Sequence, residues 1–233
     1  DGSATQLNIK MEVLSQRINS LPVSATLAMA AKARELKNQG IDIIGLSLGE
    51  PDFNTPDFIK EAAVQAVNDN WNSYSPVDGY ADLKKAICDK FKRDNQLTYT
   101  PSQIVVSTGA KQSIANVCMV LLDSGDEVLL PAPYWVSYSA IATLAEAKST
   151  IIPSSIKTDF KITPDQLEKA ITSKTKLVMF NSPNNPSGTI YTEEEYRALG
   201  KVLEKYPEIY ILSDEIYEHI NYGTPHFSIA AIP

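Results

Sequence analysis

The sequence contains few of the residues on which disulfide-stabilised proteins depend. Only two cysteines, Cys88 and Cys118, occur among its 233 residues, and both lie in apolar, helix-like patterns. Such cysteines are typical of reduced thiols in a hydrophobic core. The sequence therefore does not predict a disulfide framework.

Histidine is equally scarce, with two residues in the whole chain. His219 and His226 lie near Glu215 and Glu218, a combination that could suggest a metal site. The spacing is not that of a tight ligand set, so we expect solvated or locally bonded side chains and no metal.

Long apolar runs and an excess of positive charge are also absent. Residues 117–122 are typical of the longest apolar run, far shorter than a bilayer span. The N-terminus shows no charged segment followed by an apolar block, as a signal peptide would. The net charge is −7 with both signs mixed, and no basic patch is interleaved with aromatic residues, which argues against a nucleic-acid partner. We expect a soluble, cytoplasmic enzyme.

Three common catalytic or binding motifs are missing. No Gly-x-Gly-x-x-Gly follows a predicted strand, which argues against a dinucleotide site. No Gly-x-Ser-x-Gly elbow is present, which argues against a serine hydrolase. Residues 107–111 (Ser-Thr-Gly-Ala-Lys) lie between a strand and a helix but lack the glycine spacing of a Walker A loop.

What the sequence does contain is a regular alternation of strands and helices. Short apolar runs predict strands over residues 41–48, 104–108, 127–130, 149–152, 176–180 and 209–214. Cap residues and helical periodicity predict helices over residues 24–38, 81–95, 113–122 and 192–205, with others starting near residues 55, 134 and 163. Ser24 and Thr55 are the expected N-caps of the first helix and of the one that starts near residue 55. This alternation predicts an α/β fold with a mainly parallel, doubly wound sheet.

The strand predicted at residues 209–214 ends in a carboxylate. Ligands of open α/β sheets lie at the carboxyl ends of the strands, so Asp214 is placed where chemistry is usually done. A buried carboxylate must meet a cation or lose its charge. From this stretch alone, a surface turn in which Asp214 caps the next segment is an equally good interpretation.

Other strand ends carry further candidate groups. Gly109, Ala110 and Lys111 precede a helix, where backbone N–H groups can bind an anion, although an ordinary tight turn has the same pattern. Trp135 could be a plate for a planar cofactor or simply an amphipathic cap. Asn185 lies in a turn rich in Pro and Asn, where its amide could serve a ligand or bond its own backbone.

Two segments together carry a family resemblance. Residues 181–188 (Asn-Ser-Pro-Asn-Asn-Pro-Ser-Gly) and 213–218 (Ser-Asp-Glu-Ile-Tyr-Glu) resemble the paired signature of class I aminotransferases. Residues 49–52, 107–112 and 133–138 match the family in the same order. The resemblance covers residues 11–233 and is strongest to the bacterial branch of aspartate aminotransferases. Residues 24–26 (Ser-Ala-Thr) are part of that similarity.

The resemblance implies pyridoxal 5′-phosphate as cofactor and assigns roles to these residues. Asp214 would pair with the protonated pyridine nitrogen, and Tyr217 and Asn185 would bond the phenolic oxygen of the ring. Trp135 would stack on the ring face. The phosphate would be held by Gly109, Ala110 and Lys111.

Further roles follow from the same resemblance. Tyr74 would reach the phosphate of the neighbouring subunit, which implies a homodimer. Gly49, Trp135 and Asn185 would line the site of the substrate α-carboxylate. The prolines matching Pro133 and Pro186 can follow cis peptide bonds in this family.

The resemblance also implies a domain organisation. We interpret residues 1–10 as a cloning remnant, with Met11 as the native start. Residues 11–48 would form the N-terminal arm and a segment of the small domain, and residues 49–233 an incomplete cofactor-binding large domain. Family members bind the cofactor through a lysine downstream of the segment matching residues 214–217. None of the lysines here lies in that context, so we expect the front part of an aminotransferase, inactive alone.

The implied reaction moves an amino group between an L-amino acid, with aspartate favoured, and a 2-oxo acid, with 2-oxoglutarate favoured. Alternatives stay open. The parent enzyme could act on prephenate or aromatic substrates, or be a β-lyase on sulfur substrates. The chain could also be a non-catalytic fragment that binds pyridoxal phosphate or phosphate.

Overall fold

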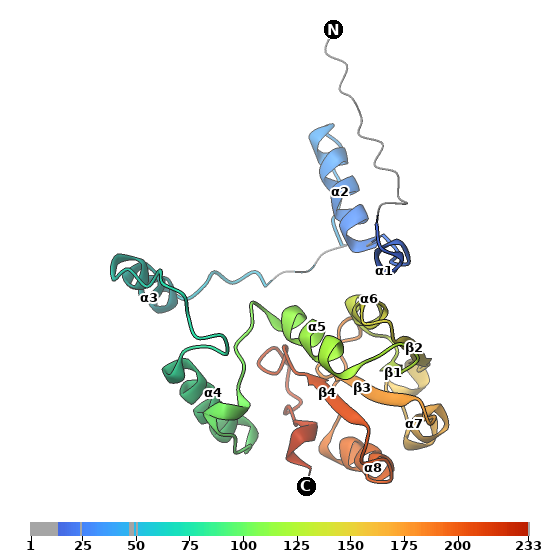
Figure 1. Ribbon diagram of the computed structural model, residues 1–233. Coiled ribbons are helices and arrows are strands. Elements are labelled where there is room, and N and C mark those ends of the chain that lie inside the picture. The colour runs from blue at the N-terminus through green and yellow to red at the C-terminus, as the bar shows by residue number, and fades with distance from the viewer. Residues whose placement is uncertain (1–13, 24, 47–48, 50, 233) are drawn as a thin grey trace. The chain divides into compact units, whose positions relative to one another are not determined.

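The computed structural model describes residues 14–23, 25–46, 49 and 51–232 (Figure 1). The chain divides into two units. One combines Asp1–Leu21 with Val77–Pro233, and the other is Pro22–Pro76. The larger unit holds the sheet and most of the predicted site residues.

The sheet has four parallel strands in the order β2-β1-β3-β4. The strands are β1 (Glu127–Pro131), β2 (Lys148–Ile152), β3 (Thr175–Asn181) and β4 (Tyr210–Asp214). Their positions agree with the predicted ones to within about one residue at each end, as expected for such boundaries. Because all strands run the same way, their carboxyl ends lie at one edge of the sheet. The prediction of a mainly parallel α/β sheet is confirmed.

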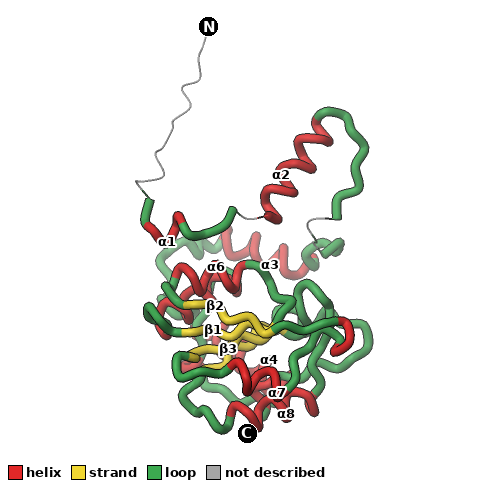
Figure 2. Tube along the Cα trace, turned by 90° about the vertical axis from the view of Figure 1, so that its right-hand side faces the viewer, coloured by secondary structure: helices red, strands yellow, loops and turns green. Residues whose placement is uncertain are grey.

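Two hydrophobic cores cover the two faces of the sheet. Side chains alternate along each strand, so Leu129 and Val178 face one core while Val128 and Leu177 face the other. The first core is closed by α7 (Pro164–Ala170) and α8 (Glu193–Leu203), the second by α5 (Ala110–Leu121) and α6 (Ser137–Leu144). Figure 2 shows the strands between α6 on one face and α7 and α8 on the other. Each large apolar side chain buried this way contributes about 1.5–3 kcal/mol.

Helices α7 and α8 begin where their sequences predict. Thr192 Oγ1 accepts from Glu195 N at 3.2 Å, and Glu195 Oε2 accepts from Thr192 N at 2.8 Å. Thr163 and Gln166 make the same reciprocal pair. These capping boxes satisfy backbone N–H groups that the first turn of a helix leaves unbonded.

The remaining elements are helical. In the larger unit they are α1 (Gln16–Asn19), α4 (Ala81–Asn95) and three short 3-10 helices, Pro101–Gln103, Ile156–Thr158 and Ile229–Ala231. In the smaller unit they are α2 (Ala25–Asn38) and α3 (Asp57–Asn68). The predicted Thr55 cap of α3 is wrong: Pro56 is the N-cap and makes no side-chain bond. The predicted Ser24 cap of α2 lies outside the described residues.

The prediction of a strand is wrong for two segments. Residues 104–108 and the described part of 41–48 form no strand. A strand requires a neighbour whose backbone groups complete its ladder, and no described strand lies alongside either segment. Ile104 is still buried, but Val105 is 66% exposed. Val106 N donates to Asp78 O at 3.1 Å, outside any ladder.

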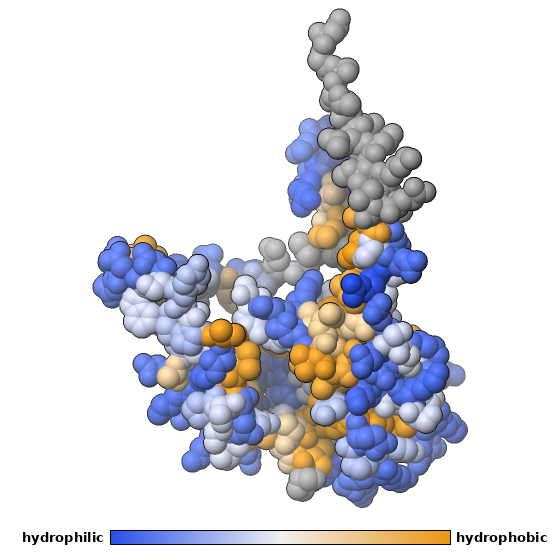
Figure 3. Space-filling model, in the orientation of Figure 1, coloured by the Kyte–Doolittle hydropathy of each residue, from blue (hydrophilic) through white to orange (hydrophobic). Residues whose placement is uncertain are grey.

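The outer side of α5 is apolar. Met119 and Val120 are largely exposed, and Figure 3 shows hydrophobic residues gathered over this helix. Within the described ranges, no helix has both the length and the apolar character that crossing a membrane requires.

Candidate functional site

The N-terminus of α5 forms an open, polar turn. Gly109 is its N-cap, with φ +86° and ψ 155°, a conformation that is costly for any residue with a Cβ. A Cβ built there would meet nothing within 4 Å, so the space beside it is open. Thr108 N donates to Gln112 Oε1 at 2.6 Å, which ties the turn to the helix.

The first N–H groups of α5 are available to a ligand. Across the described part of the chain, no acceptor bonds the backbone N–H of Ala110 or Lys111. Helix N-termini concentrate partial positive charge, and the Lys111 ammonium adds a full one. This turn fits a phosphate group.

Lys111 also connects α5 to the segment before α6. Its Nζ lies 4.7 Å from the centroid of the Trp135 ring, over the indole face. The Trp135 ring in turn meets the Tyr138 ring edge-to-face, with centroids 5.5 Å apart and planes at 88°. Both the cation–π contact and the edge-to-face ring contact have favourable geometry and stabilise the position of the indole ring. The indole is therefore held on two sides.

The Asp214 carboxylate at the end of β4 is held by two hydrogen bonds. Tyr138 donates its hydroxyl to Oδ2 at 2.7 Å, and Ile216 N donates to Oδ1 at 3.2 Å. Burial, followed by the neighbouring Asp214 charge, raises the pKa of Tyr138 far above its ordinary value. The phenol therefore stays protonated and acts as the donor.

Asparagine residues at the end of β3 and in the turn that follows hold the backbone around Asp214 by hydrogen bonds. Asn181 Nδ2 donates to Asp214 O at 2.9 Å, and Asn185 N donates to Asn181 Oδ1 at 2.7 Å. Asn185 Nδ2 lies 3.4 Å from the Tyr217 hydroxyl, a long hydrogen bond. The peptide bonds before Pro133 and Pro186 are cis, as the resemblance implied.

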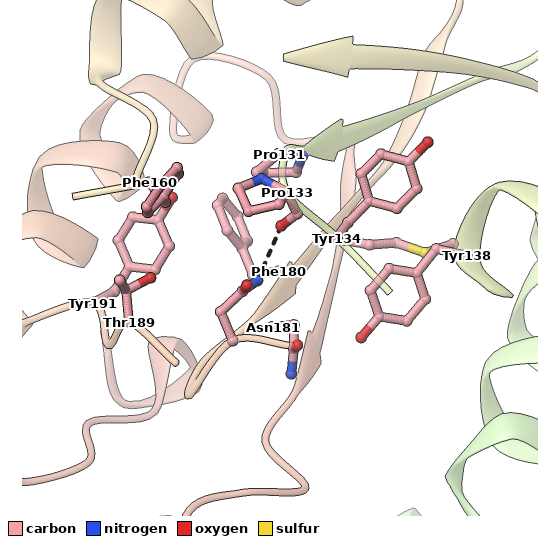
Figure 4. Close-up of a pocket in the computed structure, with 11 residues that line it drawn as sticks. Pro131, Pro133, Tyr134, Tyr138, Phe160, Phe180, Asn181, Thr189 and Tyr191 are labelled. Atoms are coloured by element: carbon pink, nitrogen blue, oxygen red, sulfur yellow. Dashed lines mark hydrogen bonds between the residues drawn. The ribbon is translucent and has the colours of Figure 1, made fainter. Parts of the chain in front are cut away.

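A small pocket shares Tyr138 and Asn181 with this site. It measures about 10 Å³ and is lined by aromatic and polar side chains, including Tyr134, Tyr138, Phe160, Asn181 and Tyr191. Figure 4 shows the two tyrosines of the α6 segment on one side and Phe160 with Tyr191 on the other. A space of this size holds about one water molecule, not a cofactor.

The predicted site residues thus fall into two groups. Lys111, Trp135, Asn185, Asp214 and Tyr217 are linked by the contacts above, together with the turn of Gly109 and Ala110. Gly49 and Tyr74 belong to the smaller unit, where both are exposed.

Tyr138 is a member of the site that the sequence prediction missed. Its signal was its place three residues after Trp135, which puts the two side chains on one face of a helical turn. Asn181 was missed as well, although it ends the strand next to β4.

Comparisons with known proteins give the family of the chain. A family model described as aminotransferase class I and II matches residues 41–232. The chain is 53% identical to an aspartate/prephenate aminotransferase of Nitrosomonas europaea over 89% of this chain and 52% of that protein. It is 50% identical to an aspartate aminotransferase of Bacillus subtilis, over 94% of this chain and 56% of that one.

Solved structures agree. The aspartate aminotransferase of Rhizobium meliloti has a TM-score of 0.90 and 44% identity, over 93% of this chain and 55% of that chain. That of Thermus thermophilus with maleate has a TM-score of 0.91 and 40% identity, over 94% and 57%. The chain thus spans about half the length of these relatives. It belongs to the class I and II aminotransferase family and has the aspartate aminotransferase fold.

Proposed function

We propose that the chain supplies most of the cofactor site of an aminotransferase that moves an amino group between an L-amino acid and a 2-oxo acid. Membership of the family implies pyridoxal 5′-phosphate as the cofactor. The observation that carries the proposal is the linked set of Asp214, Tyr138, Trp135 and Lys111 beside the open N-terminus of α5. These groups match a cofactor with a basic ring nitrogen, a flat ring and a phosphate.

Each residue then has a role in holding that cofactor. Ala110 and Lys111 offer backbone N–H groups and an ammonium to the phosphate, and Gly109 leaves room for it. The indole of Trp135 offers a flat surface to the ring. Asn185 and Tyr217 offer an amide and a phenol to the ring oxygen.

Asp214 has the central electrostatic role. When bound, the cofactor supplies an electron sink for the negative charge left when the substrate Cα loses its proton. That capacity depends on a positive ring nitrogen, which a carboxylate stabilises by charge pairing. Because Tyr138 and Ile216 already orient Asp214, little reorganisation is needed.

For the substrates, we propose aspartate with 2-oxoglutarate. The support for aspartate is that the relatives named above are aspartate aminotransferases. A second candidate is prephenate, because the Nitrosomonas relative is named for both substrates. Gly49, Trp135 and Asn185 are the residues that we assign to the substrate α-carboxylate.

The remaining assignments are also proposals. We assign Tyr74 to the phosphate of a neighbouring subunit, which makes the working form a homodimer, and we place the enzyme in the cytoplasm. We further propose that these 233 residues alone do not complete the reaction, because none of their lysines lies in the sequence context of the covalent one. Borohydride reduction of the chain with pyridoxal 5′-phosphate, followed by mass spectrometry, tests this. A single modified lysine with steady transamination would contradict it.

The central test is Asp214→Asn in the protein expressed at the full length that its gene encodes. Losing a charged hydrogen bond should weaken cofactor binding about 10- to 100-fold, measured by equilibrium dialysis. Asp123→Asn, in an exposed loop, is the control. Unchanged cofactor affinity in D214N would reject the proposal.

A further inference from the structure

A second carboxylate, Glu215, directly follows Asp214 and lies on the other side of the sheet. Successive side chains of a strand point to opposite faces, and the partners of these two residues agree with that. Asp214 bonds Tyr138 of α6, whereas Glu215 bonds residues near the C-terminal end of the chain. Only 16% of the Glu215 side chain is exposed.

Every oxygen of the Glu215 carboxylate has a partner. Ser213 and Ser228 donate their hydroxyls to Oε1, each at 2.7 Å. Oε2 lies 3.1 Å from Nε2 of His226. Within the described residues, His226 Nδ1 is buried without a partner, so Nε2 is the nitrogen that carries the shared proton.

The residues that bind Glu215 from the C-terminal side are themselves anchored. Ser228 is buried and begins the 3-10 helix Ile229–Ala231, which packs on α8. Ile229 belongs to the core between the sheet and α8, and Ile232 packs against it. The carboxylate is therefore tied to a rigid support.

Glu215 is also part of the turn that shapes the site. Glu218 N donates to Glu215 O at 2.9 Å, which closes the turn around Tyr217. Ile216 N, the next backbone group, donates to Asp214 Oδ1. A shift of Glu215 would thus move a hydrogen bond to Asp214 and the start of the Tyr217 turn.

We propose that Glu215 is a positioning residue that holds Asp214 and Tyr217 in place through its bonds to Ser213, Ser228 and His226. This inference rests on the proposed function, because it assigns Glu215 to the same cofactor site from outside it. Glu215 does not itself contact the cofactor.

A metal ion is a weaker explanation of the same cluster. Ligand atoms of Glu215, Glu218 and His226 lie within 4.8 Å of one another. Glu218, however, already accepts from the Lys90 ammonium and from Asn95 Nδ2, and Glu215 already has three partners. A cation would have to displace Lys90, so hydrogen bonding accounts for the cluster better.

The test compares two cofactors in the full-length protein. One is pyridoxal 5′-phosphate and the other is its analogue with CH in place of the ring nitrogen. The unaltered protein should bind the analogue about tenfold more weakly, because Asp214 loses its partner. In Glu215→Ala that ratio should fall below about threefold, because Asp214 is no longer aligned. Dialysis well below the melting temperature separates this from a loss of stability.

Matched variants make the result decisive. Glu215→Gln should keep the ratio, because the amide oxygen still accepts from both serines and the amide NH2 can donate to His226 Nε2 when the imidazole carries its proton on Nδ1. The exposed Glu204→Ala should not change the ratio. If the unaltered protein does not discriminate between the cofactors, the role proposed for Asp214 fails. If it does, and E215A discriminates equally well, the inference is overturned. Should E215A not fold, Ser228→Ala removes one donor, and an unchanged ratio there would overturn it equally.

Discussion

The hydroxyl of Tyr138 donates to Oδ2 of Asp214 across 2.7 Å, joining α6 to the end of β4. Tyr138 is 1% exposed and Asp214 is half-buried, so the bond is partly shielded from water. The carboxylate is therefore oriented by the protein itself, before any ligand binds. Such preorganisation lowers the cost of binding.

Tyr138→Phe should separate this bond from the packing of the ring. The variant keeps the aromatic contact with Trp135 but leaves Asp214 with one donor fewer. We expect about 1–2 kcal/mol less stability in urea unfolding, together with weaker cofactor binding. Tyr206→Phe is the control, because the Tyr206 hydroxyl bonds no group in the described residues. In this variant both quantities should stay near their original values. Equal losses in the two variants would argue against a special role for Tyr138.

Gly109→Ala should affect both the fold and the phosphate turn. At φ +86° a methyl group strains the backbone, and it would fill the open space beside the first turn of α5. We expect about 1–3 kcal/mol less stability and a clear loss of affinity for pyridoxal 5′-phosphate.

Gly125→Ala is the matched control for that variant. Gly125 also has a positive φ, +100°, and open space around it, but it lies in the loop before β1. Gly125→Ala should lose about as much stability as Gly109→Ala but keep its affinity for the cofactor. Calorimetry and dialysis on both variants distinguish backbone strain from a blocked binding turn.

Lys111→Ala should weaken cofactor binding in a salt-dependent way. Lys111 is in the first turn of α5, and its ammonium, which lies over the Trp135 ring, would add a full positive charge for a bound phosphate. We expect about a tenfold loss of affinity at low salt that shrinks as ionic strength rises. Lys176→Ala is the control, since Lys176 makes a similar ring contact with Tyr210 far from the turn. A salt-independent loss would point to packing rather than charge.

Glu218 should make the fold sensitive to acid. Burial alone would raise its pKa, but hydrogen bonds from Lys90 and Asn95 outweigh burial and hold the pKa below the ordinary 4.5. A lowered carboxyl pKa stabilises the fold above the unfolded value, and this stability is lost as the pH falls through the folded one. Glu218→Gln should therefore flatten the stability profile below about pH 5, measured by urea unfolding at several pH values. Glu208→Gln, an exposed residue, should leave the profile unchanged.

Much of the fold could be predicted because local patterns and tertiary packing agree there. β1 and β3 are buried on both faces, and their continuous apolar runs are the signal of central parallel strands. Thr163 and Thr192 begin helices with the residues that a capping box requires. In these places each level of structure favours the same outcome.

Segment 104–108 forms no strand, although its sequence predicts one. Its apolar residues have the composition of a strand, but a strand is defined by its neighbour, which local sequence does not reveal. Tyr138 illustrates the same limit in the site. Its spacing from Trp135 could be read from the sequence, but its bond to Asp214 depends on how α6 packs on a strand 76 positions away in the chain.

The position of β4 at the border of the sheet has a consequence for assembly around Asp214. Among the described strands, β4 pairs only with β3. The backbone donors and acceptors along the other edge of β4 can therefore pair with another strand. Any strand that joined there in parallel would finish beside Asp214. A strand added at this border would therefore also bring new side chains to the proposed cofactor site.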